Sequence, residues 1–148
     1  MDRVSRTVRS QVMASVKSSG TRLESALANA LTRTRLPKFE RNSPKVEGRP
    51  DFVFPKLRVA IFLDSCFWHG CRWHCRMPAS NQAYWIAKIQ RNRARDKRVS
   101  SSLKRQGWIV IRIWEHTLNR AGGIDAAILK IKHGLVRKQI GKAAAANQ

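Results

Sequence analysis

The chain has 148 residues, of which 43% are hydrophobic, enough for one globular domain with a single core. Its 30 Lys and Arg residues outnumber 9 Asp and Glu, giving a formal net charge of +21. Folding needs no such excess, and self-repulsion opposes compaction, so the charge predicts a nucleic-acid partner and argues against a membrane surface.

Neither a membrane anchor nor a secretion signal is expected. The sequence contains no run of about 18 apolar residues, and the segment M-D-R-V-S-R-T-V-R-S lacks an apolar signal core. The three cysteines have metal-ligand spacing, which fits a reducing compartment. We therefore expect a cytoplasmic protein.

The first predicted element is a basic helix or arm over residues 1–18 that lies on nucleic acid. Val8, Val12 and Val16 recur at helical spacing. A solvated terminal helix is the alternative. Met13, beside this stripe, is either a wedge into a base stack or a core residue.

A second helix is predicted to end at about Arg33. Its apolar positions recur three or four residues apart, at Leu23, Leu27, Ala30 and Leu31. Thr21 and Glu24 fit a capping box. Glu24 is therefore either a local cap or an active-site carboxylate that projects from this helix.

A β-hairpin is predicted after an irregular, basic segment at residues 35–49. Its strands are residues 51–54 and 58–63. Asp51 opens the first strand and Asp64 follows the second, so the hairpin places both carboxylates at the same end of the sheet. Such a pair can hold Mg²⁺, which prefers oxygen ligands, although both residues also suit simple turns.

The segment of residues 64–75, D-S-C-F-W-H-G-C-R-W-H-C, is typical of a metal site. The short spacings of Cys66, Cys71 and His74 let them reach one ion, and zinc favours four N or S ligands. The fourth ligand is either Cys75 or a distant residue, for which His116 is the best candidate. Plain burial of the thiols, or a disulfide, is the alternative, but the odd cysteine count and the crowding favour zinc.

Three further residues of this segment are candidates for chemistry. His69 stands between two cysteines, so bound zinc would fix its backbone and leave the imidazole to activate water. It could instead be a ligand or a DNA contact. Phe67 and Trp68 either project into DNA, where inserted rings unstack a base step, or pack around the loop.

The remaining elements are a helix over about residues 82–105, a strand at 108–113, a helix at 124–140 and a frayed tail at 141–148. Asp96, the only acid of the long helix, either forms an ion pair within the helix or orients a catalytic histidine. Together the elements predict a single α/β domain over residues 1–148, a small mixed β-sheet flanked by helices.

The chain resembles the very short patch repair endonucleases, the Vsr family, over roughly residues 6–118. Four motifs carry the resemblance: G-R-P-D-F at 48–52, I-F-x-D-x-C-F-W-H-G-C at 61–71, Y-W-x-x-K-I-x-R-N-x-x-R-D at 84–96 and G-W-x-V-x-R-I-W-E-H at 107–116. This resemblance implies a restriction-endonuclease-like fold with structural zinc. It also implies a Mg²⁺-dependent site that nicks one strand of duplex DNA 5′ to the thymine of a T:G mismatch.

The resemblance also implies roles for individual residues. Asp51 would hold Mg²⁺ with the backbone carbonyl of Leu63, His69 would activate water with the support of Asp96, and Glu24 would belong to the same site. The zinc ligands would be Cys66, Cys71, His74 and His116. The residues that wedge into DNA would be Phe67, Trp68 and Met13.

Two departures from other members leave questions open. The zinc segment orders histidine and cysteine differently, so His74 and Cys75 compete as ligand. Asp64 stands where some members have a histidine, so it is either a second metal carboxylate or a supporting group.

Two other functions stay open at this point. One is an endonuclease of the same fold that cuts matched DNA in restriction or phage defence, and the other is a zinc-stabilised DNA-binding module without catalysis. For the mismatch endonuclease we expect a monomer with mismatch-repair proteins as partners.

Overall fold

The computed structural model describes residue 7 and residues 22–147, and the fold below concerns these residues. The predicted arm at residues 1–18, apart from residue 7, and Met13 within it lie outside the described part. Residues 22–33 form a helix. The elements that follow are β1 (Glu40–Arg41), β2 (Phe52–Phe54), the 3-10 turn η1 (Pro55–Leu57), β3 (Val59–Asp64), α2 (Gln82–Arg105), β4 (Ile109–Trp114), α3 (Glu115–Asn119) and α4 (Gly123–Ala146). Among these helices, none is long and apolar enough to cross a membrane.

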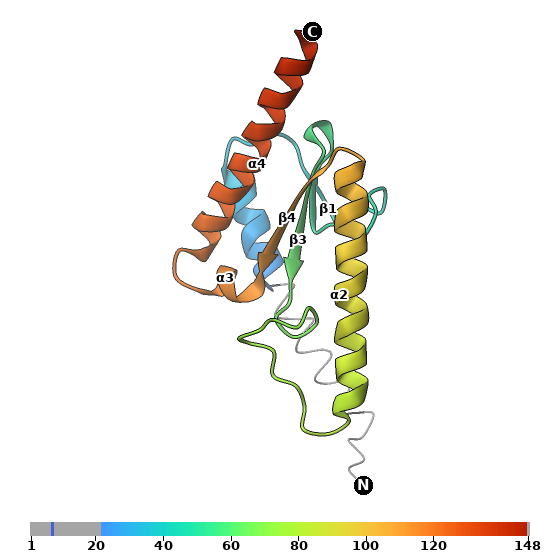
Figure 1. Cartoon of the computed structure of the whole chain (residues 1–148). Helices are drawn as coiled ribbons and strands as arrows, with labels where there is room; N and C mark the ends of the chain where they lie inside the picture. Colours follow the sequence, from blue (N-terminus) through green and yellow to red (C-terminus); the bar gives the residue numbers. More distant parts are fainter. Residues whose placement is uncertain (1–6, 8–21, 148) are drawn as a thin grey trace.

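The four strands form one mixed sheet in the order β1-β2-β3-β4. The first two pairs are antiparallel, which confirms the predicted hairpin of β2 and β3. Strands β3 and β4 are parallel, with Ile61 opposite Ile111. A parallel pair needs a crossover connection, and α2 provides it (Figure 1).

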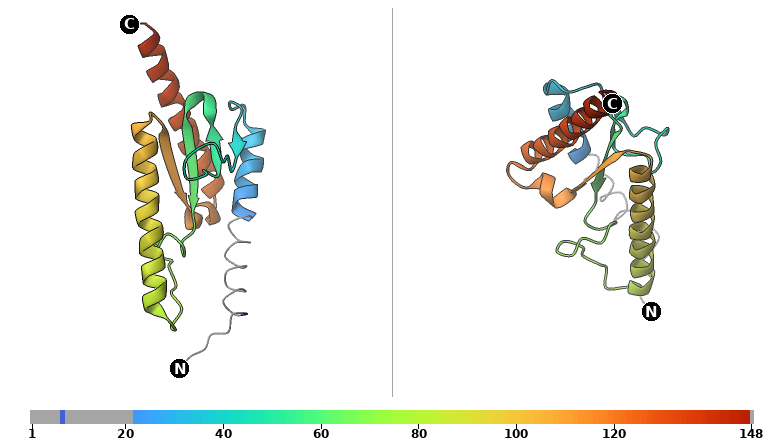
Figure 2. Two further views of the ribbon diagram at one scale, coloured as in Figure 1. Left: turned by 90° about the vertical axis from the view of Figure 1, so that its right-hand side faces the viewer. Right: turned by 45° about the horizontal axis from the view of Figure 1, so that its top comes forward.

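Side chains of β3 alternate between the two faces of the sheet and contact two separate hydrophobic cores. Val59 and Ile61 face a large core against the helix of residues 22–33 and α4, whereas Ala60 and Phe62 face a smaller core against α2. Figure 2 shows the sheet with α2 on one face and the other two helices on the opposite face. This arrangement confirms the predicted restriction-endonuclease-like α/β fold.

The same alternation places charged residues on the α2 face of the sheet. Asp64 lies two residues beyond Phe62, so it points to the same side. Arg112 of β4 is the register partner of Phe62 and shares that face. On α2, Asp96 precedes the buried Val99 by three residues, so it belongs to the helix stripe that packs on the sheet.

Two short elements and the end of the last helix differ from the predictions. Strand β1 lies within the segment expected to be irregular, and α3 was not predicted at all; both are short and depend on tertiary pairing. The last helix was expected to end at Ile140, with a frayed tail beyond, but α4 continues to Ala146 and its final turns extend past the sheet (Figure 1). The four consecutive alanines explain this, because alanine has the highest helix propensity.

We expect Gly123→Ala to lower the free energy of unfolding by about 1–3 kcal/mol. A Cβ at this position would lie 2.0 Å from the carbonyl oxygen of Thr117, so α3 and α4 would have to separate. Gly141→Ala is the matched control: nothing lies within 4 Å of its Cβ, and it should stabilise the helix by about 0.5–1 kcal/mol. Urea denaturation of both variants measures the difference, and equal shifts would contradict the close packing of α3 on α4.

Candidate active site and metal centre

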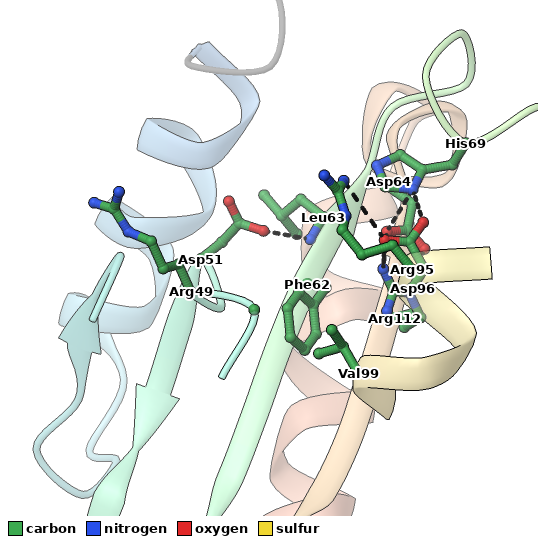
Figure 3. A pocket seen from close by; sticks show the side chains of 11 residues that line it. Arg49, Asp51, Phe62, Leu63, Asp64, His69, Arg95, Asp96, Val99 and Arg112 are labelled. Atoms are coloured by element: carbon green, nitrogen blue, oxygen red, sulfur yellow. Dashed lines mark hydrogen bonds and ion pairs between the residues drawn. The ribbon is translucent and has the colours of Figure 1, made fainter. Parts of the chain in front are cut away.

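A pocket of about 440 Å³ opens where β3 ends (Figure 3). Five predicted site residues line it: Asp51, Leu63, Asp64, His69 and Asp96. Its other lining residues are Gly48, Arg49, Phe62, Arg95, Val99 and Arg112. Polar and charged side chains from distant parts of the sequence therefore meet in this pocket. They come from the hairpin, the segment after β3 and the helix α2.

Asp51 stands at one side of this pocket, immediately before β2. The backbone N–H of Leu63 donates a hydrogen bond of 2.7 Å to its Oδ2. The pKa of Asp51 is raised from 3.8 to about 6, mainly by burial; the negative charges of Glu24 and Asp64 act in the same direction, and the hydrogen bond from Leu63 opposes them. A partly protonated carboxyl near neutral pH is a position where a dication would be favourable, because the metal stabilises the ionised form.

Glu24 is not one of the residues that line the pocket, but its negative charge contributes to the raised pKa of Asp51. Its Oε1 accepts hydrogen bonds from Arg41 at 3.0 Å and Asn42 at 2.9 Å. The side chain thus bridges from the helix of residues 22–33 to β1 and the residue after it. The capping partner Thr21 lies outside the described residues.

His69 faces the opposite side of the pocket from Asp51, next to two carboxylates (Figure 3). Its Nδ1 makes a hydrogen bond with Asp96 Oδ2 and lies 3.7 Å from Asp64 Oδ1. Of the two roles open for Asp96, the structure thus supports orientation of a histidine. An ion pair within α2 is weaker, since Arg95 lies 4.0 Å away.

Arg112 is the residue of this site that sequence reasoning missed. Its Nε and Nη2 donate to the two oxygens of Asp64 at 2.9 and 3.1 Å, and Nη2 also lies 3.2 Å from Asp96 Oδ1. Asp64 is 5% exposed, so it is a buried, paired carboxylate and not a simple turn residue. One sequence signal was present: Arg112 is the only charged residue of the apolar strand I-V-I-R-I-W.

A second cluster lies beside the pocket and consists of Cys66, Cys71, His74 and His116. One ligand atom from each lies within 4.8 Å of all the others. Cys66 Sγ is 3.3 Å from His116 Nδ1, and Cys71 Sγ is 3.5 Å from His74 Nδ1 and 3.6 Å from His116 Nδ1. These separations match the edges of a tetrahedron, about 3.6 Å, around an ion with bonds of about 2.0–2.3 Å, so the four donors fit zinc.

The thiols of the cluster differ in acidity. Burial raises the pKa of Cys66 to about 11. Burial acts the same way on Cys71, but hydrogen bonds from the Trp73 and His74 backbones lower its pKa overall. Cys75 is not in the cluster: its Sγ instead lies 3.7 Å from the carbonyl oxygen of Phe67.

The loop that carries these ligands is tied to two helices. The N–H of Cys71 donates to the carbonyl oxygen of Cys66 at 2.9 Å, which closes the loop around His69. Glu115 of α3 accepts from the Cys66 N–H at 3.1 Å. Asn92 of α2 donates to the Trp68 carbonyl at 3.1 Å. His69 is therefore held from both sides even before an ion is considered.

Phe67 and Trp68 are half-buried and contact one another as well as α2. Their ring centroids lie 5.5 and 6.2 Å from that of Trp85. Lys88 Nζ lies 4.8 Å from the Trp68 ring centroid. In the chain without DNA, the rings thus pack around the loop, while their insertion into DNA stays a prediction.

Comparison with known proteins places the chain in a family. The family described as DNA mismatch endonuclease Vsr matches residues 1–75. A type II nicking enzyme of Neisseria meningitidis serogroup C is 44% identical over 118 residues, 78% of this chain and 79% of that enzyme. The DNA mismatch endonuclease Vsr of Escherichia coli (strain K12) is 37% identical over 116 residues, 76% of this chain and 72% of that protein. The chain belongs to the Vsr family.

Membership of the Vsr family makes the chain a DNA endonuclease with DNA as its partner, as the motifs predicted. It also supports a mismatch endonuclease as the broad class. A second type II nicking enzyme, from Lentzea aerocolonigenes, is 44% identical over 112 residues, 73% of this chain and 68% of that enzyme. The relatives thus carry names of two kinds, mismatch endonuclease and type II nicking enzyme.

We expect His74→Ala to abolish stoichiometric zinc binding and Cys75→Ala to preserve it. His74 contributes one of four convergent donors, whereas the Cys75 thiol points elsewhere. Loss of a structural zinc ligand should also lower the melting temperature, because metal binding contributes to folding. Elemental analysis of the purified variants, paired with thermal denaturation, measures both effects. The reverse pattern would make Cys75 the ligand.

Asp51→Asn should stabilise the Mg²⁺-free protein by about 1–3 kcal/mol at pH 7.5. Unfolded Asp51 ionises near pH 3.8 and folded Asp51 near 6. Between pH 3.8 and about 6 the folded state keeps a proton that the unfolded state has released, so the free energy of unfolding falls as pH rises through this range. The loss is complete once the pH is well above 6. Asparagine cannot ionise and escapes the loss.

Urea denaturation at pH 7.5 and pH 4 with a chelator present measures this effect. The stability gain of Asp51→Asn should shrink toward zero at pH 4, where Asp51 is protonated in the folded protein. Asp125→Asn is the matched control, because this carboxylate is exposed at the start of α4 and has no burial penalty to relieve. A gain that is equal at both pH values would exclude ionisation of Asp51 as its cause.

Proposed function

We propose that this Vsr-family endonuclease nicks one strand of duplex DNA 5′ to the thymine of a T:G mismatch. The observation that carries the proposal is a single pocket with Asp51 at one side and the His69–Asp96 pair at the other (Figure 3). Phosphodiester hydrolysis needs an activated water and neutralisation of charge on the phosphate. The two sides of the pocket suit these two tasks.

His69 is the proposed general base. A proton on Nδ1 that is donated to Asp96 leaves Nε2 unprotonated, so Nε2 is the nitrogen that accepts a proton from water. Asp96 positions the ring and stabilises the imidazolium that forms. The carboxylate-oriented histidine is a recurrent arrangement for this chemistry.

Asp51 is the proposed Mg²⁺ ligand, with the backbone carbonyl of Leu63. The hydrogen bond from the Leu63 N–H holds the carboxylate beside the backbone of that residue. The raised pKa of Asp51 supports the assignment, because a buried carboxylate near other negative charges favours a dication. Bound Mg²⁺ would stabilise charge on the scissile phosphate.

Zinc in the cluster of Cys66, Cys71, His74 and His116 would have a structural role. Four protein ligands leave no open position for substrate, as in closed structural sites. The ion would join the loop after β3 to α3. His69 lies between two ligands of one loop, so the ion would stiffen the backbone that carries the base.

Phe67 and Trp68 are the proposed wedge at the mismatch. They adjoin Cys66 in the loop, so a stiff loop presents them near the reacting phosphate. Ring insertion costs a few kcal/mol per base step, and less where pairing is already weak. This difference favours mismatched DNA. Met13 would wedge from the other groove, and Glu24 would complete the acidic side of the site.

We also propose a monomer that acts on the bacterial nucleoid in the cytoplasm, with mismatch-repair proteins as partners. One chain supplies both sides of the pocket, so a second copy is not needed for chemistry. The net charge of +21 suits a DNA-rich environment. A mismatch substrate is shared with repair proteins, which motivates the choice of partner.

A second candidate is an endonuclease that nicks matched DNA, in restriction or phage defence. Its support is that two of the relatives described above are named type II nicking enzymes. A zinc-stabilised DNA-binding module without catalysis has less support, because a binding module needs neither the His69–Asp96 pair nor a buried Asp51.

We expect the protein with Mg²⁺ to nick a T:G duplex and to leave the corresponding T:A duplex intact. Gel electrophoresis of end-labelled strands gives the rate and the position of the nick. Asp51→Asn should lower the rate by at least about 100-fold with little change in DNA binding, because it removes the proposed Mg²⁺ carboxylate. Asp125→Asn is the charge-matched control.

The outcomes separate the three functions. Equal nicking of both duplexes would support the endonuclease for matched DNA. Binding without cleavage of either duplex would support the non-catalytic module. Full activity of Asp51→Asn would remove Asp51 from the site whichever duplex is cut.

A further inference from the structure

The imidazole of His69 faces two carboxylates but has only one nitrogen toward them. Nδ1 contacts Asp96 and lies 3.7 Å from Asp64 Oδ1. A single N–H donates one good hydrogen bond, so the two carboxylates compete for it. The ring would turn differently for each partner, and its orientation decides where Nε2 points.

Arg112 determines which carboxylate accepts the His69 N–H, because its planar guanidinium presents several donors in a fixed fork. Nε and Nη2 occupy both oxygens of Asp64, at 2.9 and 3.1 Å. Asp96 receives only one contact from Arg112, at 3.2 Å to Oδ1. Its other oxygen, Oδ2, is the one that meets His69. The arginine thus satisfies one carboxylate completely and leaves half of the other for the imidazole.

The guanidinium is itself locked in place. Nη1 donates to Ser100 Oγ at 2.9 Å, and the guanidinium carbon lies 4.7 Å from the centroid of the Phe62 ring. Its side chain is 23% exposed. A planar fork fixed at this many points cannot be reproduced by lysine, which is a single flexible point charge.

We propose that Arg112 is a positioning residue that assigns Asp96, and not Asp64, to His69 by occupying both oxygens of Asp64. The inference rests on the proposed role of His69 as the base. With a single point charge in place of the fork, one oxygen of the buried Asp64 would lack a donor and would draw the imidazole away from Asp96. The reacting nitrogen would then be displaced from the water it must deprotonate.

The test is Arg112→Lys, which keeps the charge and removes the fork. We expect kcat for nicking a T:G duplex to fall about 10- to 100-fold, the range for residues that orient a functional histidine. KM should change by less than about 3-fold, because Arg112 acts on the imidazole and not on DNA. Arg58→Lys is the control: the Arg58 guanidinium donates to the Gln106 carbonyl oxygen at 3.0 Å, at the far end of the sheet.

A second substitution separates positioning from plain stabilisation. Adding Asp64→Asn to Arg112→Lys removes the competing carboxylate, so kcat should recover by at least about 5-fold relative to Arg112→Lys alone. An ion pair that only stabilises the fold predicts that the melting temperature recovers in the double variant, while kcat per folded molecule stays at the wild-type level in both variants. Wild-type kcat in Arg112→Lys, or no recovery in the double variant, would overturn the proposal.

Nitrogen-15 NMR of histidine-labelled protein reads the ring directly and needs no activity. The chain has four histidines, and His69→Ala identifies the signals of His69. Arg112→Lys should shift both ring nitrogens of His69, and Arg58→Lys should shift neither. Unchanged His69 signals in Arg112→Lys would contradict the proposal. Full nicking by His69→Ala would instead refute the proposed base, which distinguishes the two failures.

Discussion

The register of β3 is the constraint on which the site depends. Its residues alternate between the large aliphatic core and the face covered by α2, so Ile61 and Leu63 point one way while Phe62 and Asp64 point the other. A slip of one residue would exchange the two faces and bury Asp64 in the aliphatic core. Antiparallel pairing with β2 and parallel pairing with β4 fix this register on both sides, and the aromatic and branched side chains of β2 reinforce it. The position of the carboxylate is thus a consequence of core packing.

The loop after β3 extends this fixed strand end to a fixed position for His69, the proposed base. Its ties to α2 and α3 come from residues far away in the sequence, Asn92 and Glu115, and the four donors of the Cys/His cluster converge across the same junction. A base placed within hydrogen-bond range of its partner needs such redundancy, because a displacement of about 1 Å can cost about 100-fold in rate. The metal cluster and the active site therefore share one small segment of chain, and loss of either is expected to disturb the other.

Sequence reasoning succeeded where the signal was local. The hairpin, the bounds of α2 at residues 82–105 and the convergence of Cys66, Cys71, His74 and His116 all follow from periodicity, ligand spacing or family motifs. It failed for β1 and α3, because a two-residue strand and a five-residue helix carry no period of their own. Arg112 was overlooked as a site residue because its role depends on three elements meeting. For Asp96 the sequence left two roles open, and its place on the apolar stripe of α2 rather than on the basic face favours orientation of a histidine.

The charges of the pocket are distributed unevenly, in agreement with the proposed metal site on the Asp51 side only. Asp64 and Asp96 share the guanidinium of Arg112, and Arg95 lies 4.0 Å from Asp96, so each of these carboxylates has a cationic partner within the protein. Within residues 22–147 Asp51 forms no ion pair; its Oδ2 accepts from the Leu63 N–H, and burial raises its pKa to about 6. An arginine beside Asp51 would form a stable ion pair with it, and the carboxylate would then hold no metal ion for the phosphate. Asp51 without a cationic partner is less stable, but its charge is available to the proposed metal ion, which would contact the substrate as well. The instability at Asp51 is therefore the counterpart of the stability that Arg112 gives to the other side.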